Sequence, residues 1–106
     1  MEKRKAHHSL TQLKDLIKDE ATRVITRSSL KDANGVGLSE TEVVDTILEL
    51  KQTNFYKSMT THQSSSKWQD VYKTSRNNIN LYIKLQISDN NEGVVVSFKK
   101  DEGGEK

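Results

Sequence analysis

The chain of 106 residues contains no cysteine and no proline, and aromatic residues make up only 6 % of it. The missing cysteine excludes disulfide bonds and thiolate zinc sites, and it suits a reducing cytoplasm. No stretch approaches the roughly 18–20 consecutive apolar residues of a membrane span, so we expect no membrane segment. The basic residues near the start are not followed by an apolar run, which argues against a secretory signal.

Several chemical motifs are missing too. The sequence has no glycine-rich loop for a dinucleotide or a nucleoside triphosphate. Ser64, Ser65 and Ser66 lack the strand–turn–helix setting of a nucleophilic serine. No histidine and carboxylate have the helical spacing of metal ligands, so we expect neither a metal nor another cofactor. His7 and His8 are expected to be exposed, and of the three histidines we consider only His62 as an acid or base.

The net charge of +2 conceals a marked segregation of charge along the chain. Residues 39–51 carry one Lys against four Asp and Glu, whereas residues 52–88 carry five Lys and Arg against one Asp. A local positive field attracts polyanions whatever the net charge of the protein. We interpret the acidic segment as a solvated helix face and the basic segment as a candidate surface for a polyanion.

The apolar pattern predicts an α+β fold in a single domain, residues 1–106, with a small antiparallel sheet flanked by helices. The expected helices span residues 9–20, 27–34 and 39–51, and the expected strands span residues 24–26, 68–73, 79–87 and 94–99. Ser39 and Glu42 have the spacing of a capping box, as do Ser9 and Gln12. Residues 89–93 read as a hairpin loop, and residues 101–106 as a frayed tail.

Strict alternation between Ile79 and Ile87 lets us ask which polar groups share a face of the sheet. Tyr82 and Lys84 lie on the polar side of this strand. On the returning strand, the residues expected in the core are Val94, Val96 and Phe98. That assignment sends Ser97 and Lys99 to the polar side. If residues 68–73 pair alongside, Gln69 and Lys73 join them, and Tyr56, Lys57 and Met59 reach the rim.

These side chains suit RNA, because lysines hold phosphates and flat or soft side chains accept unstacked bases. They also suit metal-independent cleavage, which needs a base for the 2′-hydroxyl, cations for the phosphorane and an acid for the 5′-oxygen. Lysines packed together lower one another's pKa, which is the direction that a general base requires. Tyrosines and lysines on one sheet face are equally typical of an ordinary surface.

Five segments together carry a resemblance to a known family. They are MEKR at the start, FYKSMTT at 55–61, WQDVY at 68–72, LYIK at 81–84 and VVVSFK at 94–99. In this order they resemble the MqsR toxins, the motility quorum-sensing regulator family. The resemblance runs over nearly the whole chain.

The resemblance implies the toxin of a bacterial type II toxin–antitoxin pair, with a RelE-like fold and a cytoplasmic location. It implies an mRNA interferase, an endoribonuclease that cuts free mRNA at GC-containing triplets and so inhibits translation. The implied partner is an MqsA-like antitoxin with a zinc-binding part and a helix-turn-helix part. On this view the toxin reaches DNA only indirectly, through the antitoxin.

The resemblance also points to individual residues. The residues that we expect to be catalytic are Tyr56, Lys57, Gln69, Tyr82 and Lys99. The residues that we expect to contact RNA are Met59, from the resemblance, Lys73 and Lys84, from the shared sheet face, and Trp68, as a ring on which a base could stack. Lys57 is the candidate general base or phosphate ligand. Two alternatives stay open: a non-catalytic RNA-binding module that uses the same face, and a decayed toxin that acts only within an antitoxin complex.

Overall fold

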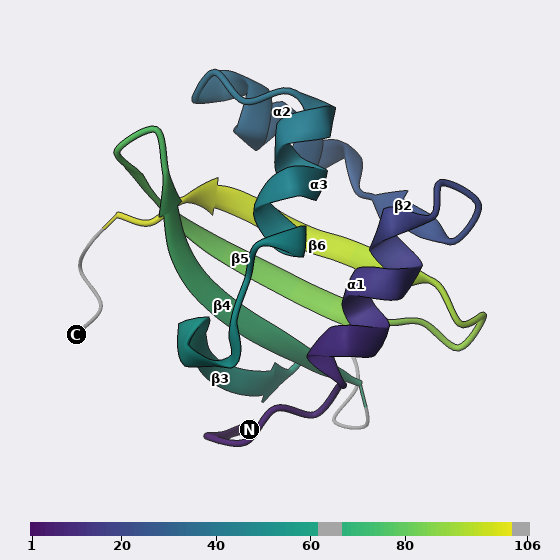
Figure 1. The fold of residues 1–106 in the computed structure, drawn as a ribbon. Coiled ribbons are helices and arrows are strands. Elements are labelled where there is room, and N and C mark those ends of the chain that lie inside the picture. Colours follow the sequence, from purple (N-terminus) through teal and green to yellow (C-terminus); the bar gives the residue numbers. More distant parts are fainter. Residues whose placement is uncertain (62–66, 103–106) are drawn as a thin grey trace.

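A computed structural model describes residues 1–61 and 67–102 of the chain (Figure 1). The helices are α1 (Leu10–Lys18), α2 (Arg27–Gly35), α3 (Glu40–Leu48) and the short 3-10 helix η1 (Gln52–Asn54). The strands are β1 (Glu2–Lys3), β2 (Arg23–Ile25), β3 (Phe55–Thr60), β4 (Trp68–Arg76), β5 (Ile79–Ile87) and β6 (Gly93–Lys100). The expected α+β class is confirmed.

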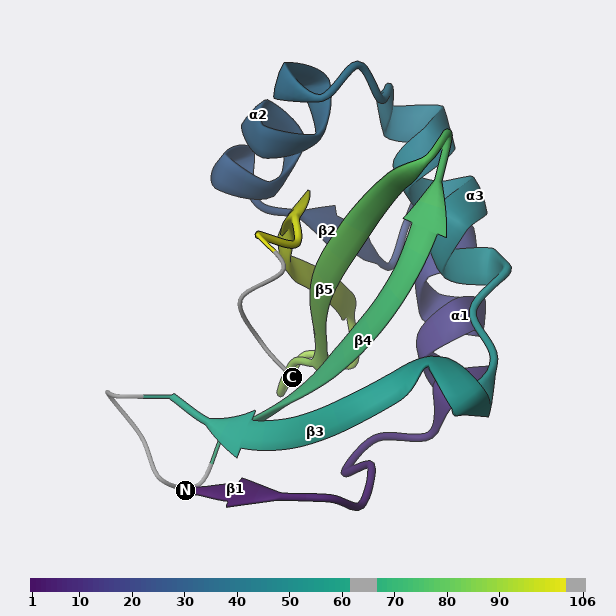
Figure 2. The same cartoon turned by 90° about the vertical axis from the view of Figure 1, so that its left-hand side faces the viewer.

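The strands form one sheet in the order β1-β3-β4-β5-β6-β2. Neighbouring strands are antiparallel except β2, which runs parallel to β6. Figure 2 shows α1 and α3 on one side of the curved sheet, while α2 lies near its β6 and β2 end. The opposite side of β3, β4 and β5 is therefore available to carry a functional surface.

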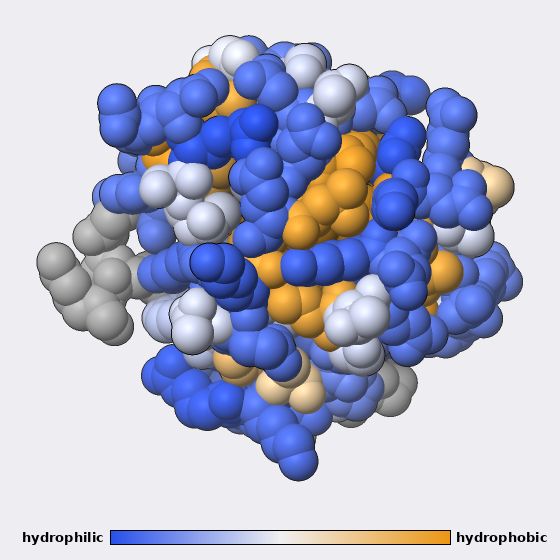
Figure 3. Space-filling view, viewed as in Figure 1, coloured by the Kyte–Doolittle hydropathy of each residue, from blue (hydrophilic) through white to orange (hydrophobic). Residues whose placement is uncertain are grey.

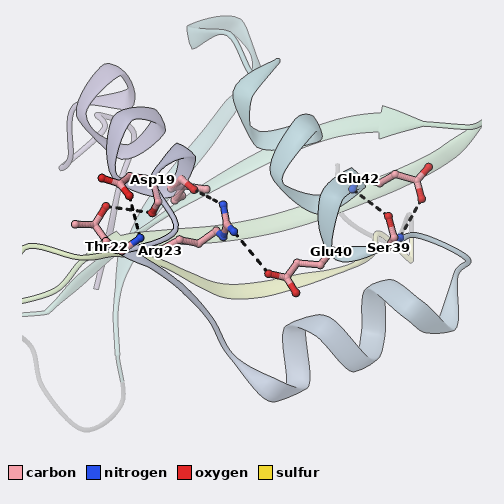
Figure 4. A network of polar contacts seen from close by, with 8 residues as sticks. Asp19, Thr22, Arg23, Ser39, Glu40 and Glu42 are labelled. Atoms are coloured by element: carbon pink, nitrogen blue, oxygen red, sulfur yellow. Dashed lines mark hydrogen bonds and ion pairs between the residues drawn. The ribbon is translucent and has the colours of Figure 1, made fainter.

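The helices begin where the sequence predicts. The Ser9 hydroxyl accepts a hydrogen bond from the Gln12 amide at the start of α1, at 3.2 Å. Ser39 and Glu42 form a complete capping box at the start of α3 (Figure 4). Each cap satisfies amides that a helix start otherwise leaves unpaired. The third helix ends at Leu48, three residues earlier than expected, and η1 follows it.

The core lies between the sheet and the α1–α3 layer. On β5, Leu81, Ile83 and Leu85 are completely buried, as the alternation predicts. They share the core with Leu13 and Ile17 of α1. On the outer side of the same layer, Figure 3 shows apolar surface gathered over and between α1 and α3, framed by hydrophilic residues.

The returning strand β6 corrects one expectation. Val95 is buried with Phe98, whereas Val94 and Val96, which we expected in the core, are only half-buried. The cause is a β-bulge: Lys84 pairs with Ser97, but the next residue, Leu85, pairs with Val95. A bulge adds one residue to one strand and shifts the alternation beyond it.

Two strands and one turn were not predicted. The first strand, β1, has only two residues, and β3 covers the FYKSMT segment that we had placed at the rim of the sheet. The β4 strand continues to Arg76, and a tight turn at Asn77 and Asn78 leads into β5. Both asparagines have positive φ angles, 55° and 66°, as a type I′ hairpin turn requires.

Tyr72 offers a test of the core. Its ring is fully buried and packs edge-on against Phe55, and its hydroxyl has no hydrogen-bond partner among the described residues. Burial, with a smaller contribution from the Asp70 charge, raises the Tyr72 pKa to about 12. An unfolded tyrosine ionises near pH 10, so the folded state should lose roughly 2–3 kcal/mol of stability between about pH 10 and 12. Urea unfolding at these pH values should show this loss in the wild type and not in Tyr72→Phe.

The tail begins in an ordered way. The Asp101 amide donates to the Asn80 carbonyl at 2.8 Å, so the expected fraying does not start at residue 101. Residues 103–106, and His62 with the serines at 64–66, lie outside the described residues. Within residues 1–61 and 67–102, no helix has the length and apolar character needed to cross a membrane.

Candidate active site

The face of the sheet that is turned away from α1 and α3 is built from cross-strand rows. In one row, Lys57 pairs with Val71, Val71 with Lys84, and Lys84 with Ser97. In the next row, Lys73 pairs with Tyr82, and Tyr82 with Lys99. Directly opposed residues lie about 5 Å apart and share a face. We call the residues of these two rows, with Tyr56, the lysine face.

A bulge at Tyr56 brings β3 into this arrangement. Phe55 pairs with Tyr72, but Lys57 pairs with Val71, so Tyr56 is the extra residue. The bulge lets Phe55 pack into the core while Lys57 points to the opposite side. The Tyr56 ring lies among cations, with the Lys73 ammonium 4.1 Å and the Lys57 ammonium 5.3 Å from its centroid.

The lysine face is hollowed at its centre. The hollow has a volume of about 510 Å³ and is lined by Lys57, Tyr82, Lys84, Lys99, Lys100, Asp101 and Glu102. The Lys99 ammonium lies 5.5 Å from the Tyr82 ring centroid, and the Lys73 ammonium lies 5.9 Å from it. Several cations thus surround one aromatic ring in a site open to an elongated anion.

The pKa values of Lys84 and Lys57 are shifted in opposite directions. Burial, followed by the charges of Lys99 and Lys57, lowers the pKa of Lys84 below the ordinary lysine value. The Lys57 pKa is raised instead, mainly by its hydrogen bond to the Glu2 carboxylate at 2.7 Å. This direction is the opposite of what the sequence argument assumed for Lys57 as a general base. Lys57 fits the other expected role, a charged phosphate ligand, and Lys84 has the direction that a base requires.

Beside the lysine face, the same side of the sheet carries two glutamine side chains. Gln69 donates its side-chain N–H to the Gln86 carbonyl oxygen at 3.0 Å. Met59 pairs in register with Gln69, so it lies on the same face. The structure therefore brings together all the expected site residues except one, Trp68.

Trp68 lies on the other face of β4, next to the N-terminal segment. The His7 ring stacks on it at 5.6 Å between centroids, and the Lys3 ammonium lies 4.2 Å from its centroid. The backbone of this segment is also fixed, because the buried Asp70 carboxylate accepts hydrogen bonds from the His7 and His8 amides. His7 is exposed as expected, whereas His8 is half-buried.

Sequence reasoning missed two carboxylates at the lysine face. Glu2 on β1 forms an ion pair with Lys57, and Asp101, just after β6, forms an ion pair with Lys73 at 3.4 Å. A two-residue strand has no detectable periodicity, so nothing in the sequence placed Glu2 beside Lys57. Asp101 was missed because its segment looked like an unstructured acidic tail.

The chain matches known proteins over most of its length. Residues 5–100 match the family model described as "Motility quorum-sensing regulator, toxin of MqsA". The chain is 37 % identical over 100 residues to the "mRNA interferase toxin MqsR" of Escherichia coli (strain K12), covering 94 % of this chain and 99 % of that protein. The resemblance inferred from the sequence motifs is confirmed. The chain belongs to the motility quorum-sensing regulator family, the toxins of MqsA.

Proposed function

We propose that this protein is the toxin of a toxin–antitoxin pair and an mRNA endoribonuclease whose site is the lysine face. The observation that carries the proposal is the group of three lysines, Lys57, Lys84 and Lys99, that lines one hollow together with Tyr82. A related protein 37 % identical in sequence bears the name mRNA interferase. The substrate is free mRNA, cut at GC-containing triplets without a ribosome and without a metal ion.

The reaction proceeds by attack of the ribose 2′-oxygen on the adjacent phosphorus. Lys84 in its neutral form accepts the proton of the 2′-hydroxyl, because its pKa is lowered in the hollow. The P–O5′ bond breaks, and the leaving oxygen takes a proton from Tyr82 or from a charged lysine. Lys57 and Lys99 stabilise the charge on the phosphorane. The products are a 2′,3′-cyclic phosphate and a 5′-hydroxyl.

The remaining residues of the site position the strand. Tyr56 offers a ring for a base next to the scissile phosphate, and Met59 extends that surface. Gln69, held by Gln86, presents an amide that donates and accepts hydrogen bonds. Lys73 contacts a neighbouring phosphate. Trp68 has no part in this proposal, because it lies on the opposite face.

The proposal is tested by incubating the purified chain with a long mRNA in excess EDTA and mapping the new 5′ ends. We expect cuts clustered at GC-containing triplets, with 5′-hydroxyl ends. A 2′-deoxy substitution at one mapped position should abolish that cut alone. Cleavage that survives the 2′-deoxy substitution would contradict the chemistry. RNA that binds but stays intact would favour the binding module or the decayed toxin.

The family description names MqsA as the partner of these toxins. We propose that this chain binds an MqsA-like antitoxin with a zinc-binding part and a helix-turn-helix part, in the bacterial cytoplasm. Contact with DNA then comes only through the antitoxin. A neighbouring gene for such a protein, and its co-purification with this chain, would support the pairing.

A further inference from the structure

Two ion pairs on the lysine face join its cations to the two ends of the chain. The Glu2 carboxylate lies 2.7 Å from the Lys57 ammonium, and the Asp101 carboxylate lies 3.4 Å from the Lys73 ammonium. The side chains of Lys57 and Lys73 are only 14 % and 24 % exposed. Asp101 is 15 % exposed, so its carboxylate lies within the face.

The sheet fixes the backbone beside both carboxylates. Glu2 pairs in register with Met59, next to Lys57 on β3. The Asp101 amide is bonded to the Asn80 carbonyl, one residue after the end of β6. Hydrogen-bonded backbone thus holds both acidic residues beside the lysines, and Asp101 also lines the central hollow.

A carboxylate and a phosphodiester each present negatively charged oxygens that accept hydrogen bonds from an ammonium group. A lysine already paired with a carboxylate has little net charge to offer a phosphate. An RNA strand that crosses the face must therefore displace these carboxylates to reach Lys57 and Lys73. The raised pKa of Lys57 and the lowered pKa of Glu2 agree with a formed ion pair in the free protein.

We propose that Asp101 and Glu2 occupy two phosphate subsites of the lysine face and compete with RNA for Lys73 and Lys57. This inference rests on the proposed function, because it takes RNA as the ligand. It adds that carboxylates of the chain itself occupy two of the positions at which the face would bind RNA phosphates. It also gives the first acidic residue after β6 a role in setting affinity and salt dependence.

The test measures binding of a 2′-O-methyl RNA oligonucleotide, which this chemistry cannot cleave, by fluorescence anisotropy at several salt concentrations. Asp101→Asn and Glu2→Gln should each bind about two- to fivefold tighter at low salt, the size expected for releasing a lysine from one ion pair at the protein surface. The plot of log affinity against log salt should steepen by up to about 0.7 for each freed lysine. In a Lys73→Met background, Asp101→Asn should give no gain.

Glu49→Gln is the matched control. It removes one negative charge as well, but it frees Arg76, which pairs with Glu49 outside the lysine face. Gains in both test variants above this control support the proposal, and a gain in either one no larger than the control's overturns it. Unchanged binding alongside normal mRNA cleavage would leave the proposed function standing without this inference. If the wild-type protein does not bind RNA at all, both the proposed function and this inference are wrong.

Discussion

Replacing Lys84 by arginine should lower the single-turnover rate of mRNA cleavage by roughly 10²–10⁴-fold, the range for losing a general base. Arginine keeps the positive charge but does not give up its proton in a protein. Affinity for an uncleavable RNA should therefore change little. Lys57→Arg is the matched comparison: it lies in the same row, and its proposed role is that of a charged ligand. It should keep far more of the activity, whereas Lys57→Ala should fold and cleave little or not at all.

The pH dependence separates the roles further. If neutral Lys84 is the base, the wild-type rate should rise with pH and level off below the ordinary lysine pKa of about 10.4. The direction follows from burial and from Lys99 and Lys57, which lower the Lys84 pKa. The residual cleavage rate of Lys84→Arg should not show this rise with pH. Near-normal cleavage by Lys84→Arg, with loss in Lys57→Arg, would show that Lys57 carries the base role.

The sequence predicted the parts of the fold in which local chemistry and burial agree. From Ile79 to Ile87 the alternation is complete, because one face of β5 packs on α1 and the other faces solvent, so Tyr82 and Lys84 were placed correctly. The N-cap of α3 at Ser39 could equally be predicted from the sequence, since the capping box depends on two residues three positions apart.

The parts that failed depend on contacts between distant segments. The β-bulges at Tyr56 and near Val96 are set by pairing with β4 and β5, so a period-2 pattern cannot reveal them. The position of Trp68 on the face opposite to its neighbour Gln69 follows from the alternation of β4, but the N-terminal segment that covers it there could not be predicted. The pairing of Lys57 with Glu2 joins residues 55 positions apart, and this contact reversed the expected direction of the Lys57 pKa.

The fold itself should be most sensitive at a carboxylate that the sequence reading passed over. Asp70, the third residue of β4, is fully buried. It accepts hydrogen bonds from the Ser58 hydroxyl at 2.6 Å and the His8 amide at 2.8 Å, and from the His7 amide through both oxygens. Replacing Asp70 by alanine takes the acceptor from the His7 and His8 amides and leaves the Ser58 hydroxyl with the Gln69 carbonyl at 3.3 Å. We expect a loss of about 2–4 kcal/mol in the free energy of unfolding, measured by urea denaturation.

A local effect should accompany the global one. Asp70 holds the segment that carries β1, so its loss should release β1 from β3 and Glu2 from Lys57. Hydrogen exchange should accelerate at residues 2–9 more than in β5, and the raised pKa of Lys57 should fall toward the ordinary lysine value. Asp89→Asn, which removes an exposed partner of Lys67, should change stability by less than about 0.5 kcal/mol. A stability loss without faster exchange at residues 2–9 would mean that Asp70 serves the core alone. Faster exchange there would instead make this buried carboxylate the link between the N-terminal segment and the charge state of the lysine face.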